Sequence, residues 1–223
     1  MHFRLLIFFL FISASIHAQS FSFTLRFGAP LQMPLPLVIK QDGYPDIKIK
    51  SARFYSEPLF SPVYWDWRMA YSKNKKEWGL SSIHHKLYLR NKPPEVARFS
   101  LSHGYNYVFI DRIVPLTGGV FFAGGGLGLV IAHPESTVRG QVFEEKEVFK
   151  GYFPIGPAMM LAFDYRISIL RWMYFTAGAK SCFSYSVVPI ANGSARLTDV
   201  SLHFSAGLGF RKVKREKTDG PFG

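Results

Sequence analysis

Residues 63–71 read Val63-Tyr64-Trp65-Asp66-Trp67-Arg68-Met69-Ala70-Tyr71. The odd-numbered positions hold Val, Trp, Trp, Met and Tyr, whereas the even-numbered positions hold Tyr, Asp, Arg and Ala. Successive side chains of a β strand point to opposite faces, so this stretch predicts a strand with one wholly apolar face and one mostly polar face. Such a strand suits a wall between lipid and water.

The same alternation returns near the end of the chain, where Leu202, Phe204, Ala206, Leu208 and Phe210 alternate with His203, Ser205, Gly207 and Gly209. Several of the strand-length stretches between these two run well past the usual 5–6 residues, and a tilted membrane strand needs roughly 9–11. These stretches are residues 77–88, 97–110, 116–132, 151–166 and 169–186.

The first eighteen residues predict a secretory signal peptide. Arg4 precedes an unbroken apolar run over 5–12, and small Ala18 stands at the expected cleavage site before Gln19. No later window offers 18 uncharged apolar residues. An exported chain that spans a membrane without helices must satisfy its backbone hydrogen bonds between strands of a closed barrel. We therefore expect an outer-membrane protein of a Gram-negative bacterium.

Composition agrees with a barrel but leaves a soluble secreted β-protein open. The 223 residues are 48% hydrophobic and 17% aromatic, yet mean hydropathy lies near zero. The net charge of +12 usually suggests nucleic acid, but export argues against a nucleic-acid partner. A single cysteine, Cys182, excludes an internal disulfide and a cysteine-rich metal site.

Connection lengths alternate along the chain. Short connections are expected at 72–76, at 111–115 and near 166, and longer ones at 90–96, 133–150 and 187–198. Outer-membrane barrels place short turns in the periplasm and long loops outside. The basic turn 73–76 and the basic tail 212–223 would then both be periplasmic, either facing anionic phospholipid or simply solvated.

Seven strands between 62 and 211 are clear, and bacterial barrels usually have an even number. We favour residues 46–55 as the eighth, which divides the chain into signal peptide 1–18, N-terminal segment 19–45, β-barrel 46–211 and tail 212–223. Residues 21–31 are the alternative eighth strand. Pairing of 35–40 around an Asp42-Gly43 turn would give ten strands, although Pro30, Pro34 and Pro36 argue against it.

Over residues 46–211 the chain resembles the small outer-membrane barrel superfamily of the OmpA/OmpX type. The final strand 202–210, which alternates and ends on aromatic Phe210, looks like the C-terminal assembly signal of that group, although here the chain continues to residue 223. The resemblance implies an all-β antiparallel transmembrane barrel, with outer-membrane lipid and the barrel-assembly machinery as partners.

A histidine-rich cluster offers weak catalytic candidates, namely His85, His103 and Ser81, with Glu95 as the nearest acid. The pattern places His85 and His103 outward, at the headgroup level. Barrels resembling the lipid A deacylase family carry His, Ser and Glu there, but their His-x-Ser-Asn motif is absent and only Asn192-Gly193-Ser194 stands in a comparable stretch. We therefore expect no serine–histidine–acid triad.

No cofactor or metal is predicted, because adjacent His84 and His85 point to opposite faces and cannot hold one ion together. The glycines at 124–126 are followed by neither a Gly-Lys-Ser/Thr motif nor a helix, so they do not form a phosphate loop.

Polar residues on the inner face predict a lumen filled with paired charges rather than a transport pathway, because an eight-stranded barrel is narrow and lone buried ions are costly. The sequence thus favours a structural or binding role, with a lipid-modifying hydrolase as the alternative. The expected lumen set is Asp66, Arg68, His84, Lys86, Arg98, Lys180 and His203, with Asp164 as a weaker member.

Overall fold

The computed structural model describes residues 20–73, 76–116, 118–145 and 151–212, and the regular elements of these residues are all β strands. Within that part of the chain, no helix has the length and hydropathy of a membrane span. The expected signal peptide, and the tail apart from Lys212, lie outside the described residues.

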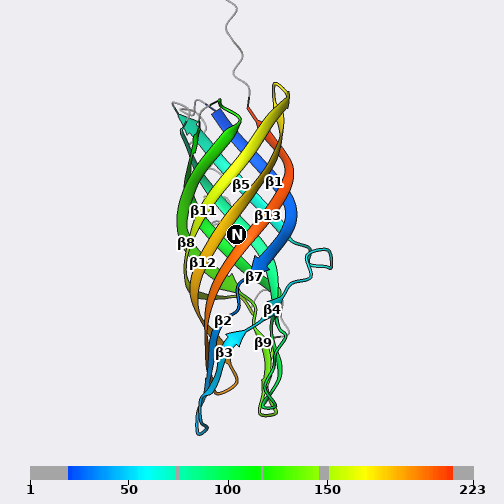
Figure 1. Cartoon of the computed structure of the whole chain (residues 1–223), viewed down its shortest axis with the longest axis vertical. Coiled ribbons are helices and arrows are strands. Elements are labelled where there is room, and N and C mark those ends of the chain that lie inside the picture. Colours follow the sequence, from blue (N-terminus) through cyan, green and yellow to red (C-terminus); the bar gives the residue numbers. More distant parts are fainter. Residues whose placement is uncertain (1–19, 74–75, 117, 146–150, 213–223) are drawn as a thin grey trace, which may run out of the picture.

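Eight strands form a closed antiparallel ring, in which each strand pairs with its neighbours and β13 pairs back to β1 (Figure 1). Closure gives every ring strand a partner on both sides over part of its length, so the ring has no edge strand. The predicted all-β, eight-stranded antiparallel barrel is confirmed. The ring consists of β1 (Ser20–Gln32), β5 (Trp65–Lys73), β6 (Lys76–Leu89), β7 (Val96–Pro115), β8 (Phe121–Ala132), β11 (Phe153–Leu170), β12 (Met173–Ile190) and β13 (Gly193–Arg211).

The eighth strand is β1, so the preferred assignment of residues 46–55 to the ring was wrong and the alternative at 21–31 was right. Strand β1 pairs with β13 from Ser22 to Gln32 and with β5 from Ser20 to Arg26. Beyond Arg26 it follows β13 alone, which leaves one side of the strand free for Pro30. The described part of the expected N-terminal segment, residues 20–45, therefore contributes a ring strand and the strand β2 (Leu35–Gln41).

Residues 35–52 form a hairpin outside the ring. Strands β2 (Leu35–Gln41) and β3 (Ile47–Ala52) pair with each other, and β2 also pairs with the first residues of β13. Gly43, with φ of +79°, occupies the predicted Asp42-Gly43 turn. The pairing that would have made ten strands thus occurs, but it extends β13 beyond the barrel and leaves the ring at eight.

Two of the connections expected to be long loops contain strands, namely 133–145, as far as the structure describes it, and 187–198, whereas 90–95 contains none. Strands β12 and β13 run through 187–198 and meet at a tight turn, where Asn192 has φ of 52°. Strand β9 (Glu135–Val138) pairs with the start of β7, β10 (Gln141–Phe143) pairs with β9, and β4 (Phe54–Tyr55) pairs with the end of β6. One end of the barrel therefore continues as two β-structured extensions, whereas the other end holds the short turns and both ends of the described chain (Figure 1).

The two extensions pack against each other and close that end of the barrel. Leu37 and Leu197 of one extension and Phe99 and Val138 of the other belong to a single buried hydrophobic cluster. At the tips, Arg139 donates to the carbonyl of Pro45 at 2.7 Å. Side chains thus fill the space between the extensions.

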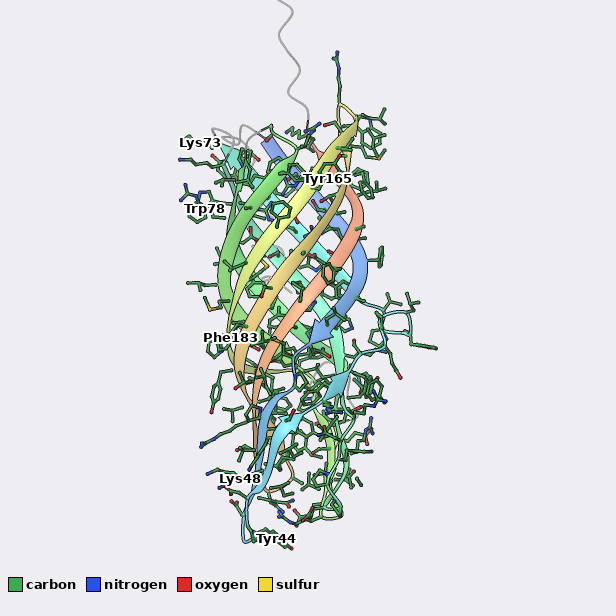
Figure 2. The ribbon with its side chains drawn as sticks, viewed as in Figure 1. Tyr44, Lys48, Lys73, Trp78, Tyr165 and Phe183 are labelled. Carbon is green, nitrogen blue, oxygen red and sulfur yellow. The ribbon has the colours of Figure 1, made fainter. Side chains whose placement is uncertain are left out.

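The outer surface of the ring is apolar on strand after strand (Figure 2). Aromatic side chains stand toward both ends of this surface, with Trp78 and Tyr165 near the short-turn end and Phe183 near the extensions. Soluble monomers rarely expose apolar patches larger than a few hundred Å². Large apolar side chains on different ring strands, each exposed by between 45% and 70%, are Phe27, Trp78, Ile110, Leu127, Leu161, Phe183 and Phe204.

Candidate functional site: the lumen and the rim cluster

Eight buried or nearly buried charged side chains form one continuous chain of ion pairs in the lumen. Cations and anions alternate along it, and the N···O distances of successive pairs lie between 2.5 and 3.3 Å. The four positive and four negative charges cancel, which avoids the high cost of an unpaired buried ion. In order, the chain reads Lys180, Asp66, Arg26, Asp164, Arg166, Glu77, Arg68 and Asp111.

Inward glycines make room for this chain of charges. A Cβ atom at Gly79 would lie 2.7 Å from Nε of Arg68 and 2.8 Å from Oδ1 of Asp111. A Cβ atom at Gly178 would lie 2.4 Å from Oδ1 of Asp164. The ion pairs therefore need glycine, which has no side chain, at these two positions.

A second polar layer follows toward the extensions, built from hydroxyls, one carboxylate and histidine. Tyr107 donates to Asp199 at 2.5 Å, and Ser201 donates to the same carboxylate at 2.7 Å. The Ser201 hydroxyl also lies 3.0 Å from Nε2 of His203, and the Tyr105 hydroxyl lies 2.7 Å from that of Ser184. With the apolar cluster beyond it, this layer leaves the lumen packed with side chains.

Part of the expected lumen set lies where the alternation placed it. Asp66, Arg68 and Lys180 stand in the ion-pair chain, together with Asp164, and His203 stands in the second layer. The sequence did not single out Arg26, which contacts both Asp66 and Asp164, because residues 19–45 were not expected to enter the barrel.

His84 and Lys86 are not in the lumen, so that prediction was wrong. Both lie on the outer face of β6, which the connection between β4 and β5 covers. Lys86 donates to the carbonyls of Phe60 at 3.1 Å and Ser61 at 3.0 Å, and the His84 ring stacks on Trp65 with centroids 5.2 Å apart. This cover lets polar side chains occupy an outer face.

His85 points inward, opposite to the predicted direction. Its ring is 1% exposed and packs against the rings of Tyr105, Tyr107 and His203. Ser81, its proposed partner, donates instead to Asp111 at 2.7 Å. These two candidates therefore do not form a site at the barrel surface.

Arg98 is also outside the lumen. It lies where β7 runs beside β9, its side chain is 46% exposed, and it pairs with Glu135. Strand β7 here has left the ring and belongs to an extension, so the alternation no longer separates lumen from lipid.

Ser102, His103, His133 and Glu135 meet at the rim, where the barrel gives way to the extensions. The register of β6 against β7 passes from His85 opposite Tyr105 to Leu87 opposite Leu101, so β7 carries two extra residues there. Gly104, with φ of +138°, lies within this bulge. The bulge interrupts the alternation between Leu101 and Tyr105, and both Ser102 and His103 contact Glu135.

The rim cluster lacks the geometry of a catalytic triad. Oε1 of Glu135 lies 3.0 Å from Nδ1 of His103, and the Ser102 hydroxyl lies 3.4 Å from that same nitrogen. A triad places acid and nucleophile on opposite ring nitrogens, whereas Ser102 here contacts Glu135 directly. Glu95, the acid considered from sequence, contributes its backbone carbonyl to Arg139.

Beside the rim cluster, an open groove of about 520 Å³ lies on the outer surface. Its lining is mostly apolar and aromatic, with three polar side chains that face one another across β6 and β7. His84 and Asn106 are joined by a 2.7 Å hydrogen bond, and His103 links the groove to the cluster. The groove is lined by Pro62, Trp65, His84, His103, Asn106, Ile131 and Tyr152.

Comparison with known proteins gave matches among solved structures only. No family model matches the chain, and no curated protein matches it. The solved structures include the outer membrane protein OprG from Pseudomonas aeruginosa, at 15% identity and a TM-score of 0.43 over 88% of this chain and 97% of that one. They also include Neisserial surface protein A, at 11% identity and a TM-score of 0.39 over 86% of this chain and 96% of that one. The attachment invasion locus protein Ail of Yersinia pestis matches at 13% identity and a TM-score of 0.36 over 86% of this chain and 97% of that one.

Proposed function

We propose that the chain is an outer-membrane β-barrel with a closed lumen, which acts in a structural or binding role through its external extensions. The observation that carries this is the reversed distribution of polarity, with an apolar surface around the ring and a neutral chain of ion pairs inside. A soluble protein has no physical reason to bury eight charges and expose its Phe, Leu and Ile side chains.

The orientation of the barrel in the outer membrane follows from the difference between its two ends. Short turns and both ends of the described chain lie at one end, which we assign to the periplasm (Figure 1). Lys73, Arg211 and Lys212 at this end would meet anionic phospholipid headgroups. Delivery to the membrane would follow export by residues 1–18 and insertion by the barrel-assembly machinery, which would recognise the last strand, β13, with its aromatic Phe210.

The test is the behaviour of the protein expressed from the full chain. We expect the mature protein in the outer-membrane fraction, soluble only with detergent, and migrating as a compact band on a denaturing gel that shifts when the sample is boiled. N-terminal sequencing should begin at Gln19. Recovery of the folded protein in a soluble fraction without detergent would contradict the proposal.

A lipid-modifying hydrolase is the second candidate, since Ser102, His103 and Glu135 meet at the rim of the barrel, where the extensions begin. The contacts do not favour it, because both the serine and the acid approach Nδ1 of His103. A binding role needs no proton transfer from serine to histidine, and the extensions offer a large folded surface outside the membrane that we propose the ring spans.

A further inference from the structure

Three potential metal ligands converge at the rim. One ring nitrogen of His103, one of His133 and a carboxylate oxygen of Glu135 lie within 4.8 Å of one another. Residues far apart in the chain supply them, because His103 comes from the β7 bulge whereas His133 and Glu135 follow β8 across the rim. Two imidazoles and one carboxylate form a typical ligand set for Zn²⁺, which leaves a fourth position open.

The surroundings hold Glu135 in a suitable orientation. Arg98, Ser100 and Ser102 all donate to its Oε2 atom. The other oxygen, Oε1, faces Nδ1 of His103 at 3.0 Å. Donors that hold one carboxylate oxygen, while the second faces a histidine nitrogen, are compatible with the outer shell of a metal site.

The two histidines are also positioned by their neighbours. Tyr152 donates to the backbone carbonyl of His103 at 2.9 Å, and its ring packs edge-on against His133 with centroids 5.3 Å apart. His133 is 2% exposed, and its Nδ1 atom is buried without a hydrogen-bond partner among the described residues. A buried imidazole nitrogen with no partner is costly unless something accepts its lone pair or proton.

We propose that His103, His133 and Glu135 bind a divalent transition-metal ion of the Zn²⁺ type at the external rim of the barrel. Zinc ligands lie about 2.0–2.2 Å from the ion, which separates them from one another by about 3.3–3.5 Å. His103 and Glu135 lie slightly closer than this, at 3.0 Å, and all three ligand atoms lie within 4.8 Å of one another. A small rotation of the half-exposed His103 ring would bring the three ligand atoms to the spacing that the ion needs.

The test is a titration of the folded, detergent-solubilised mature protein, purified without a polyhistidine tag, with Co²⁺ as a spectroscopic substitute for Zn²⁺. One Co²⁺ per chain should produce the visible absorption bands of a four-coordinate ion, and added Zn²⁺ should remove them. Absence of these bands, together with no competition by Zn²⁺, would overturn the proposal.

Variants locate the site. His103→Ala and Glu135→Gln should each weaken Co²⁺ binding at least about ten-fold. The matched control is His84→Ala, which removes an imidazole from the same groove but not from the cluster, and it should bind as the parent does. Folding of each variant is checked by heat-modifiable migration, and His103→Ala decides the result because its side chain is half exposed. Unchanged binding by folded His103→Ala, or equal loss in His84→Ala, would assign the ion elsewhere.

Discussion

At the scale of single residues, Arg26 joins the two halves of the ion-pair chain. Its guanidinium contacts Asp66 at 2.9 Å and Asp164 at 2.5 Å, and only 2% of the side chain is exposed. Each of these carboxylates has one further cation, Lys180 for Asp66 and Arg166 for Asp164. Removal of Arg26 would therefore leave a net negative charge in a closed interior.

Replacement of this residue gives the first prediction. Arg26→Ala should lower the free energy of unfolding by about 3–5 kcal/mol, because it breaks a buried network from one side. Urea titration in lipid vesicles, followed by the fraction of compact band on a gel, measures it. The control Arg196→Ala removes an exposed arginine from β13 and should change stability by less than about 0.5 kcal/mol. Equal effects of the two changes would contradict the ion-pair account.

The histidines supply the second prediction, which concerns catalysis. His85→Ala and His103→Ala should leave the lipid A acylation pattern of the host unchanged, since His85 lies inside the barrel and His103 meets serine and acid on one nitrogen. Mass spectrometry of lipid A from cells with and without the protein checks this. A deacylated species that disappears in either variant would establish the hydrolase.

At the scale of elements, the long alternating runs were enough to predict seven of the eight ring strands. In the stretches 63–71 and 202–210 one face is wholly apolar, so a shift by one residue would expose polar groups to lipid. That contrast is sufficient to predict the inward direction of Asp66, Lys180 and His203. It left β1 only as the alternative eighth strand, because alternation alone does not show whether residues 21–31 or 46–55 pair with β13.

Strand β6 shows why some faces were misassigned. Ser81 and His85 on one side resemble Ser82 and His84 on the other, so polarity could not separate lumen from exterior. The deciding fact is that the connection between β4 and β5 covers the outer face at Lys86, which is a tertiary contact. The sequence carries no local signal for it.

The rim cluster was missed for a related reason. His133 and Glu135 lie some thirty residues beyond His103 (133 − 103 = 30) in a stretch expected to be loop. They meet because β7 bulges around Gly104 and because β9 pairs back onto β7. A histidine and an acid at such a spacing are too common to predict a site.

The identity of the closing strand gives the third prediction. Leu25 of β1 lies opposite Leu208 of β13, so cysteines at both positions should cross-link with a short reagent in a Cys182→Ala background. The cross-link would change gel migration of the denatured chain. Cysteines at Ile49 and Leu208 are the control and should not react, since β3 pairs with β2 outside the ring. The reverse outcome would restore residues 46–55 to the barrel.

At the scale of the whole molecule, three layers fill the barrel along its length: the ion-pair chain, the hydroxyl and histidine layer, and the apolar cluster between the extensions. At the short-turn end, a cavity of about 140 Å³ reaches Glu77 and Arg166. An eight-stranded barrel is just wide enough for side chains to fill it. The molecule is thus built as a closed cylinder.

Closure gives the fourth prediction. Planar bilayers that contain the purified protein should show no stepwise currents above those of bilayers without it, because no continuous water path crosses the three layers. Insertion is verified by protease protection of the reconstituted protein. Reproducible discrete openings from inserted wild-type protein would contradict a filled lumen.

The most direct test of a membrane barrel is the accessibility of single spin labels along β13 in lipid vesicles. In a Cys182→Ala background, labels at Leu202, Phe204 and Leu208, which face outward, should collide often with oxygen dissolved in the lipid and rarely with an aqueous nickel complex. Labels at Ser201 and Ser205, which face inward, should collide little with either reagent. A period of two along the strand is the predicted result. High nickel accessibility at Phe204 and Leu208, or no period of two, would contradict the account.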